Sequence, residues 1–215
     1  MLIIPAINCQ DYETAISRIK LADKFLHRNY RWIHIDIVDG QFAPTETWGS
    51  PEELKKICSQ FHDIKFEIHL MVENPSAVAE EWLKAGAKRL IVHIESPGDP
   101  EKVRLIAHQY GAEAVLSGGP GVTAEKLHEV GRHFGFLQVL TVNPGFAGQK
   151  FGEDAFNKIS FLRSKLPNVK LEIDGGINDK TAMPARKAGA DCAVSASYIF
   201  GADNPAQAYE ELRNA

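Results

Sequence analysis

Four side chains of this sequence have the residue types and the setting expected of metal ligands. They are His34, Asp36, His69 and Asp174. The first two stand in Trp-Ile-His-Ile-Asp-Ile-Val at 32–38, the third in Phe-Glu-Ile-His-Leu-Met at 66–71, and the fourth in Leu-Glu-Ile-Asp-Gly-Gly at 171–176. Imidazole and carboxylate groups together suit Zn²⁺, Fe²⁺, Mn²⁺ or Co²⁺. The sequence therefore predicts a site for one divalent metal ion, provided that the fold brings these stretches together.

Polar and apolar residues alternate around the first pair. Because successive strand residues point to opposite faces, His34 and Asp36 share one face of a strand. Ile33, Ile35 and Ile37 share the other face. We expect the apolar face to pack against helices and the polar face to point into the middle of the fold. The alternative is that each polar residue is separately hydrogen-bonded at a strand end.

Apolar runs typical of strands alternate with amphipathic helical patterns from one end of the chain to the other. The expected strands cover 2–8, 31–38, 64–71, 89–95, 113–117, 136–143, 170–174 and 192–199. A helical pattern follows each strand, with examples at 12–25, 76–85, 101–110, 124–131 and 206–212. Asn-Pro or Asp-Pro pairs mark helix starts and glycines mark helix ends. The pairs stand at 74–75, 99–100 and 204–205, and the glycines are Gly86, Gly111 and Gly189.

Eight such units with no linker between them predict a parallel sheet covered by helices. An open dinucleotide-binding sheet should carry G-x-G-x-x-G after its first strand, whereas this chain has Asn-Cys-Gln-Asp at 8–11. We therefore predict the α/β class and a (β/α)8 TIM barrel that spans 1–215 as a single domain. The active site of such a barrel lies at the C-terminal ends of its strands, where the four candidate ligands stand.

The composition argues against several classes of function. A net charge of −4 and an isoelectric point near 6.1 are unlike a chain that neutralises nucleic-acid phosphates. No apolar run approaches the roughly 20 residues that span a bilayer. Three cysteines without a CxxC pair suit free thiols in a reducing compartment, and the N-terminus lacks the features of a signal peptide. We expect a cytoplasmic protein with neither nucleic acid nor membrane as a partner.

Small residues gather in three loops late in the chain. Asn-Pro-Gly-Phe-Ala-Gly-Gln fills 143–149, two glycines fill 175–176, and Ser-Ala-Ser fills 195–197. Small side chains let backbone N–H groups approach an anion, and barrels often hold a phosphate after their seventh and eighth strands. These loops therefore predict a phosphorylated substrate. The alternative for each loop is a tight turn that needs its glycine for the turn alone.

Taken together, the motifs resemble those of the ribulose-phosphate 3-epimerases. The resemblance covers essentially the whole chain. It is carried by W-I-H-I-D-I-V-D-G at 32–40, H-L-M at 69–71, N-P at 74–75, T-V-N-P-G-F-A-G-Q at 141–149 and I-D-G-G at 173–176. It implies a TIM barrel of the ribulose-phosphate-binding type in which His34, Asp36, His69 and Asp174 hold the metal. It also implies that Asp36 and Asp174 are the catalytic acid and base.

The same resemblance assigns contacts to the substrate. It implies that the 141–149 loop folds over the substrate and that backbone groups hold the phosphate. The residues expected to contact the substrate or its phosphate are Met71, Gly145, Phe146, Ala147, Gly148, Gly175, Gly176, Ala196 and Ser197. The implied cofactor is one divalent metal ion, with no organic cofactor. The implied partners are a small sugar phosphate and further copies of the chain, in a dimer or hexamer.

The implied reaction inverts C3 of D-ribulose 5-phosphate to give D-xylulose 5-phosphate. One aspartate removes the C3 proton, the metal stabilises the enediolate, and the other aspartate returns a proton to the opposite face. Several positions near the substrate depart from the family pattern. They are Ala6, Val38, Gln41, Thr45, Leu140, Ala147 and Ala196. A 3-epimerase of another ketose phosphate, such as D-allulose 6-phosphate, is therefore an alternative.

Two further hypotheses come from other classes of function. One is a non-catalytic barrel that binds a sugar phosphate, and the four intact candidate ligands argue against it. The other is decarboxylase or aldolase chemistry, which lacks support because neither an Asp-x-Lys-x-x-Asp signature nor a lysine at a strand end is found. His93 is expected to be a hydrogen-bonded core histidine rather than a neighbour of the metal ligands.

Overall fold

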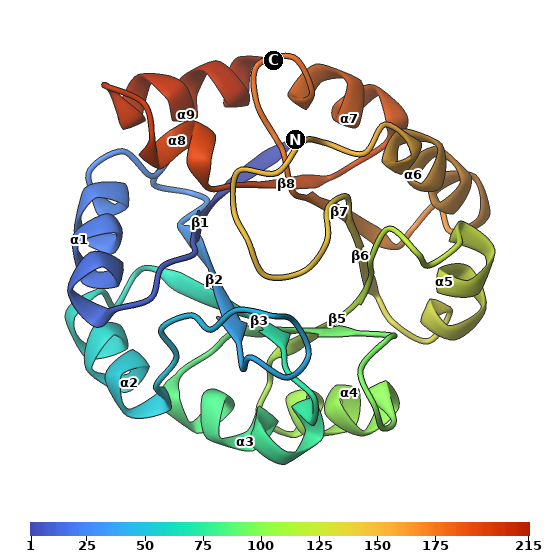
Figure 1. Cartoon of the computed structure of the whole chain (residues 1–215), viewed down its shortest axis with the longest axis horizontal. Helices are drawn as coiled ribbons and strands as arrows, with labels where there is room; N and C mark the ends of the chain where they lie inside the picture. Colours follow the sequence, from blue (N-terminus) through green and yellow to red (C-terminus); the bar gives the residue numbers. More distant parts are fainter.

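A computed structural model describes residues 1–215 and confirms the predicted TIM barrel. Eight parallel strands follow one another around a closed barrel, and the last pairs with the first (Figure 1). The strands are β1 (Leu2–Ile7), β2 (Trp32–Val38), β3 (Lys65–Met71), β4 (Arg89–His93), β5 (Glu113–Gly118), β6 (Phe136–Leu140), β7 (Lys170–Asp174) and β8 (Cys192–Ser195). Full closure leaves no strand edge unpaired.

Helices surround the barrel and cover its outer face. They are α1 (Tyr12–Asp23), α2 (Pro51–Gln60), α3 (Pro75–Ala85), α4 (Pro100–Gln109), α5 (Ala124–Gly131), α6 (Asp154–Lys165), α7 (Ala182–Ala188), α8 (Ser197–Phe200) and α9 (Pro205–Asn214). The predicted capping at Asp99 and Asn204 is confirmed by side-chain acceptors for the first turns of α4 and α9. Asn74 makes no such bond, although Pro75 still begins α3. No helix is both long and apolar enough to cross a lipid bilayer.

Four strands end earlier than the sequence predicts: β1 by one residue, β4 by two, β6 by three and β8 by four. β8 stops at Ser195 rather than 199, and residues Ser197–Phe200 form the short helix α8. The N–H of Phe200 donates to the carbonyl of Ala196 at 2.9 Å, so the chain has already turned helical. A short apolar run has no period that separates strand from helix, which explains the error. β6 likewise stops at Leu140 rather than 143.

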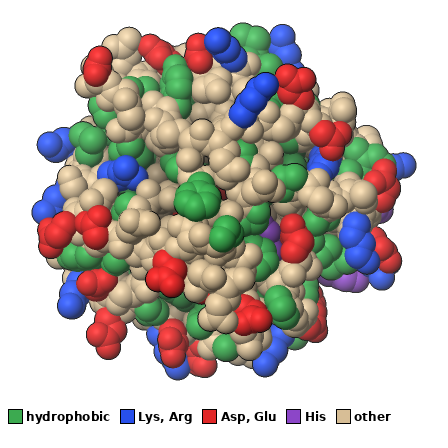
Figure 2. Space-filling view, viewed as in Figure 1, with side chains coloured by type: hydrophobic (Ala, Val, Ile, Leu, Met, Phe, Trp, Pro, Cys, Tyr) green, Lys and Arg blue, Asp and Glu red, His purple; other side chains and the backbone are tan.

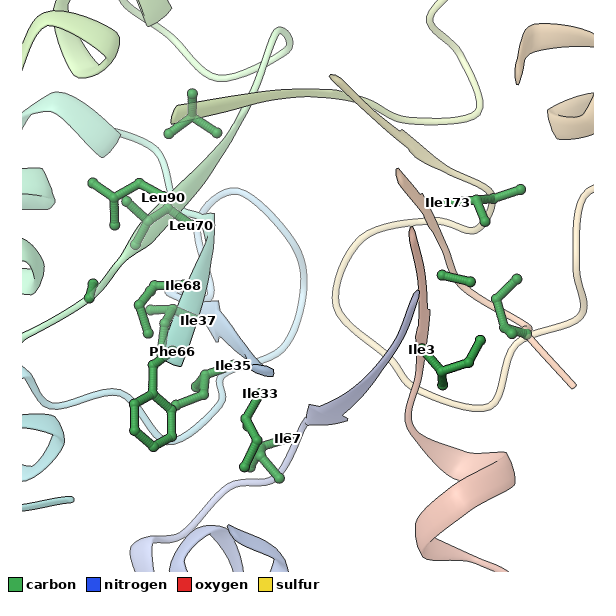
Figure 3. Packing of buried hydrophobic residues seen from close by; sticks show 14 of the residues in the cluster. Ile3, Ile7, Ile33, Ile35, Ile37, Phe66, Ile68, Leu70, Leu90 and Ile173 are labelled. Carbon is green, nitrogen blue, oxygen red and sulfur yellow. The ribbon is translucent and has the colours of Figure 1, made fainter. Parts of the chain in front are cut away.

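The alternation along β2 directs its side chains as predicted. Ile33, Ile35 and Ile37 belong to a cluster of 46 buried residues formed between the strands and the surrounding helices. Figure 3 shows these isoleucines beside Phe66 and Ile68 of β3, which belong to the same cluster. A separate set of seven buried residues, including Ile4, Ile91 and Phe136, packs apart from this layer. His34 and Asp36 have the opposite parity and lie on the inner face, away from the helices.

Loops cover one end of the barrel. Figure 1 shows the loop after β6 crossing the centre of the view, with the loop after β2 beside it. Both loops leave the C-terminal ends of parallel strands, which places them over the end where barrel active sites lie. We call residues 143–150, in the loop after β6, the lid.

Candidate active site

The strand register brings the four predicted metal ligands together. Asp36 of β2 pairs directly with His69 of β3. Both histidine side chains are fully buried, whereas the aspartates each keep 13% of their side-chain surface exposed. Ligand atoms of His34, Asp36, His69 and Asp174 all lie within 4.8 Å of one another. The expectation that these distant positions meet at one point is confirmed.

The spacing of the donor atoms fits a first-row divalent ion. His34 Nε2 lies 3.1 Å from Asp36 Oδ1, 3.2 Å from His69 Nδ1 and 3.8 Å from Asp174 Oδ2. His69 Nδ1 lies 3.2 Å from Asp36 Oδ1 and 3.4 Å from Asp174 Oδ2. Ligands about 2.0–2.2 Å from an ion are roughly 3–3.6 Å from each other. The two imidazoles and two carboxylates could therefore hold such an ion between them.

The second nitrogen of His34 is held by a buried carboxylate. His34 Nδ1 lies 2.8 Å from Glu67 Oε1, and both side chains are fully buried. Glu67 also forms a buried ion pair with Arg89. A proton on Nδ1 would be donated to Glu67, which leaves the lone pair of Nε2 directed at the other three ligands. Carboxylates behind metal-binding histidines commonly fix the ring in this way.

The second nitrogen of His69 is held by another histidine. His69 Nε2 lies 2.8 Å from His93 Nε2, and His93 Nδ1 lies 3.3 Å from Glu95 Oε2. Glu95 in turn accepts a hydrogen bond of 2.8 Å from the N–H of Gly119. His93 is buried and hydrogen-bonded as expected, but its partner is a predicted metal ligand. His93 is thus a buried, hydrogen-bonded histidine that also contacts one of the predicted ligands.

Charges in this cluster favour a positive centre. Burial opposes ionisation of His34. The negative charge of Asp36 and the hydrogen bonds to Asp36 and Glu67 outweigh this effect and raise the pKa of the imidazole well above 6.5. Burial also opposes ionisation of Asp36, yet the charge of His34 and the hydrogen bonds from both histidines lower the pKa of this carboxyl. The two carboxylates thus strongly favour positive charge between them, which is the electrostatic setting of a cation site.

A second acidic group lies deeper in the barrel. His34, Glu67 and Glu172 also come within 4.8 Å of one another. Burial, reinforced by the charge of Glu67, raises the pKa of Glu172 to about 8. Glu172 is therefore largely neutral at pH 7, and one of its oxygens has no hydrogen-bond partner. Within this group Arg89 pairs with Glu67, and Glu67 holds His34.

Each aspartate is also bonded by a neutral amide that the sequence analysis missed. Asn8 Nδ2 donates to Asp36 Oδ2 at 3.0 Å, and Gln138 Nε2 donates to Asp174 Oδ2 at 3.4 Å. Gln138 stands on β6 and pairs with Glu172 of β7, two residues before Asp174 on the same strand. A polar residue at an inward position of an apolar strand is a signal that could have identified Gln138. Asn8 follows β1 with the same parity as Ile4 and Ala6 of the inner cluster, so the same signal could have identified it.

A pocket lies above this cluster, at the mouth of the barrel. Its walls include Asp36, His69 and Asp174, together with Ala6 and Leu140. All nine predicted substrate contacts line it: Met71, Gly145, Phe146, Ala147, Gly148, Gly175, Gly176, Ala196 and Ser197. No lysine or arginine lines the pocket. Figure 2 shows the same distribution, because the Lys and Arg side chains lie toward the rim of this face rather than over its centre.

Two glycines of the pocket permit close backbone approaches. Gly176 has φ of +63°, and a Cβ there would lie 2.7 Å from the backbone nitrogen of Phe151. Gly145 has φ of +115°, and a Cβ there would lie 2.7 Å from Thr45 Cγ2. Both positions therefore require glycine. Ala196 has φ of −107°, which alanine adopts freely, so the departure at this position does not strain the backbone.

Comparison with known proteins matches these features. A family model described as the ribulose-phosphate 3 epimerase family covers residues 3–200. The chain is 36% identical over 219 residues to a ribulose-phosphate 3-epimerase of Mycobacterium bovis, covering 99% of this chain and 91% of that protein. It is 37% identical over 201 residues to a protein of Oryza sativa named ribulose-phosphate 3-epimerase, cytoplasmic isoform, covering 90% and 86%.

Solved structures agree at the level of the fold. A 3-hexulose-6-phosphate synthase matches with a TM-score of 0.75 and 20% identity, covering 100% of this chain and 99% of that one. Identity this low shows the shared barrel and nothing about the reaction. The family resemblance of the sequence motifs is confirmed by the family match and by the curated relatives. The chain is thus an enzyme of the ribulose-phosphate 3-epimerase family.

Proposed function

We propose that this protein interconverts D-ribulose 5-phosphate and D-xylulose 5-phosphate by proton transfer at C3. The observation that carries the proposal is the placement of two carboxylates around one point. Asp36 Oδ1 and Asp174 Oδ2 lie 3.2 Å and 3.4 Å from the same atom, His69 Nδ1. Both carboxylates also line the pocket. Inversion of a carbon needs a base on one side and an acid on the other, and this pair supplies them.

In this proposal one aspartate acts as the base and the other as the acid, and the two exchange these roles when the reaction runs in reverse. The ionised aspartate removes the C3 proton to give an enediolate, and the protonated one delivers a proton to the opposite face. His34, Asp36, His69 and Asp174 would hold one divalent cation, which when bound supplies Lewis-acid stabilisation of negative charge on the substrate oxygens. The identity of the cation, among Zn²⁺, Fe²⁺, Mn²⁺ and Co²⁺, follows from availability as well as from these ligands.

Phosphate would be held by backbone rather than by side-chain charge. The pocket has no lysine or arginine, but it has a stretch of small residues in the lid, at 175–176 and at 196–197. N–H groups in such turns bind anions. We propose that Gly148, Gly176, Ala196 and Ser197 contact the phosphate and that Met71 contacts the sugar. Gly145, Phe146, Ala147 and Gly175 would complete the cover over the substrate.

Deuterium exchange tests the chemistry directly. The wild-type protein in D₂O should exchange the C3 proton of D-ribulose 5-phosphate and form D-xylulose 5-phosphate. Asp36→Asn and Asp174→Asn should each lower turnover by about a thousandfold or more, since each removes an essential proton carrier. Asp203→Asn, an exposed aspartate outside the pocket, is the matched control and should match the wild type. A wild-type protein that exchanges no C3 proton with any of the four metals would exclude the proposal.

D-Allulose 6-phosphate is the second candidate substrate. Ala6 and Leu140 line the pocket, and Val38 packs with Met71, so departures from the family pattern lie at the substrate itself. The short side chain of Ala6 would leave room beside the sugar. Comparing kcat/KM for the two sugar phosphates separates the candidates. A higher value for the six-carbon sugar would replace the five-carbon assignment while keeping the two-aspartate chemistry.

We further infer a cytoplasmic enzyme that assembles as a dimer or hexamer, with neither nucleic acid nor membrane as a partner. The three cysteines are free thiols, which suits a reducing compartment. Sedimentation of the purified protein would test the assembly. A monomer at micromolar concentration would contradict this part of the proposal.

A further inference from the structure

Asn8 connects two parts of the pocket that must act together. Its amide nitrogen donates to Asp36 Oδ2 at 3.0 Å and to the backbone carbonyl of Gly145 at 3.1 Å. Asp36 is the proposed proton carrier in the wall of the pocket, and Gly145 belongs to the lid. Both partners are acceptors, so the nitrogen rather than the oxygen of the amide must face them. The two hydrogens of one planar NH₂ group are therefore shared between the lid and Asp36.

Two hydrogen bonds to neighbouring carbonyls fix the backbone around Asn8. Arg18 Nη1 donates to the carbonyl of Asn8 at 2.8 Å, and the N–H of Trp48 donates to the carbonyl of Cys9 at 2.7 Å. The register of β1 on β2 pairs Ala6 with His34 and Ile7 with Ile35, so Asn8 continues to the level of Asp36. These contacts fix the backbone from which the Asn8 side chain donates to Asp36 and to Gly145.

The two oxygens of Asp36 have different surroundings. Oδ1 lies 3.1 Å from His34 Nε2 and 3.2 Å from His69 Nδ1, whereas Oδ2 accepts from Asn8. The bond to Asn8 therefore fixes the rotation of the carboxylate, with one oxygen toward the histidines and the other toward the mouth. A hydrogen bond to a charged oxygen is stronger than one between neutral groups, which suits this orienting role.

The lid is built to reach Asn8 as a unit. Gln149 Nε2 donates to the carbonyls of Asn143 and Phe146 at 2.7 Å and 2.9 Å, which ties the lid to itself. Gly145 comes so close to Thr45 that a Cβ would lie 2.7 Å from Thr45 Cγ2. In this close approach the carbonyl of Gly145 reaches Asn8. The same amide group of Asn8 therefore contacts the lid and orients Asp36.

We propose that Asn8 is a positioning residue that latches the lid and aligns Asp36 in the same act. When the lid closes, the Gly145 carbonyl takes one amide hydrogen and thereby directs the other onto Asp36 Oδ2. The base is then correctly oriented when the pocket is covered and water is excluded. This inference rests on the proposed function for its catalytic consequence, while the latch itself is independent of the substrate.

The experiment measures the latch and the chemistry separately. The latch is measured without substrate, as the rate at which chymotrypsin cleaves after Phe146, whose surface is 56% exposed. The chemistry is measured as kcat and KM for D-ribulose 5-phosphate. Asn8→Leu, which keeps the side-chain size but removes both bonds, should raise the cleavage rate several-fold and lower kcat about tenfold or more. Asn29→Leu, the same change at an exposed site, should leave both values unchanged.

Two lid variants separate latching from alignment. Gln149→Ala loosens the lid but leaves the Asn8–Asp36 bond, so it should raise the cleavage rate and KM while kcat falls by less than in Asn8→Leu. Gly145→Ala displaces the lid from Thr45 and should reproduce both effects of Asn8→Leu. It provides the same test if the Asn8 variant does not fold.

Each outcome decides the proposal. Wild-type kcat in Asn8→Leu would overturn the positioning role. A lowered kcat with an unchanged cleavage rate would overturn the latch. Absence of turnover by the wild-type protein would defeat the proposed function instead, and the cleavage rates would then still judge whether Asn8 holds the lid.

Discussion

The Nε2 atoms of His69 and His93 lie 2.8 Å apart, and their rings stack with an interplanar angle of 7°. Only one of the two nitrogens can carry the proton of this bond. If His69 Nδ1 faces the other ligands, its Nε2 carries the proton and donates it to His93. His93 must then be neutral and protonated on Nδ1, which directs that proton to Glu95. Burial lowers the pKa of His93, in agreement with a neutral ring.

Replacing His93 should therefore weaken the metal site without removing a ligand. His93→Phe keeps the ring but leaves the Nε2 proton of His69 without an acceptor. Loss of such a supporting partner commonly costs about 10- to 100-fold in metal affinity. Titration with Zn²⁺ or Co²⁺ followed by calorimetry measures the change. His108→Phe, at an exposed position on α4, is the control. Equal affinities in wild type and His93→Phe would show that the contact does not support the ligand.

Metal removal should abolish turnover and lower thermal stability together. Four donors spaced for one ion bind it in the folded state only, so saturation at about 100 times Kd should add roughly 2.7 kcal/mol. Dialysis against a chelator followed by thermal unfolding checks this, with Zn²⁺, Mn²⁺ and Co²⁺ added back one at a time. In the double variant Asp36→Asn/Asp174→Asn, added metal should shift the melting temperature much less. A shift as large as that of the wild type would place the ion elsewhere.

The buried charges below the ligands should contribute strongly to stability. Arg89 lies over the rings of Trp32 and Phe136 at 4.0 Å and 4.4 Å and pairs with Glu67, which is fully buried. Arg89→Met leaves that carboxylate without a counterion, which should cost about 3–5 kcal/mol of unfolding free energy. Lys170→Met removes an exposed partner of Glu113 and should cost at most about 1 kcal/mol. Denaturant unfolding at pH 8 measures both, and similar losses would contradict the distinction.

Glu113 should account for part of the loss of folding stability in acid. Partial burial raises the pKa of this carboxyl, but the charge of Arg89 and the hydrogen bonds from Lys170 and Arg89 outweigh it and hold the pKa below 4.5. The unfolded chain therefore binds this proton at higher pH than the folded chain. The contribution of Glu113 is fully present above about pH 4.5 and is lost as the pH falls through the lower folded value.

Glu113→Gln tests this dependence. The difference in unfolding free energy between wild type and variant should be constant from pH 6 to 8 and should shrink below about pH 4.5. Denaturant titrations at several pH values measure the difference. A difference in unfolding free energy that grows as the pH falls would show that the interaction of Glu113 has the opposite sign.

Sequence reasoning reached the ligands and the fold because both depend on local pattern. Strand periodicity placed His34 and Asp36 on the inner face of β2, and the register with β3 confirms the neighbour relation to His69. Proline signals located the starts of α3, α4 and α9, and glycine signals located the ends of α3 and α7. The error at β8 arose where the apolar run of Tyr198 and Ile199 fits strand and helix equally well.

The sequence by itself determined the barrel, the family and the four side chains that meet at its mouth, because periodicity and motif are written in neighbouring residues. Only the tertiary structure decided how those side chains are held. Asn8 and Gly145 stand 137 positions apart, and His69 and His93 stand 24 apart. Such contacts depend on strand register and on the path of the lid, which no local pattern encodes. Closure of the barrel turned separate polar residues into one connected site.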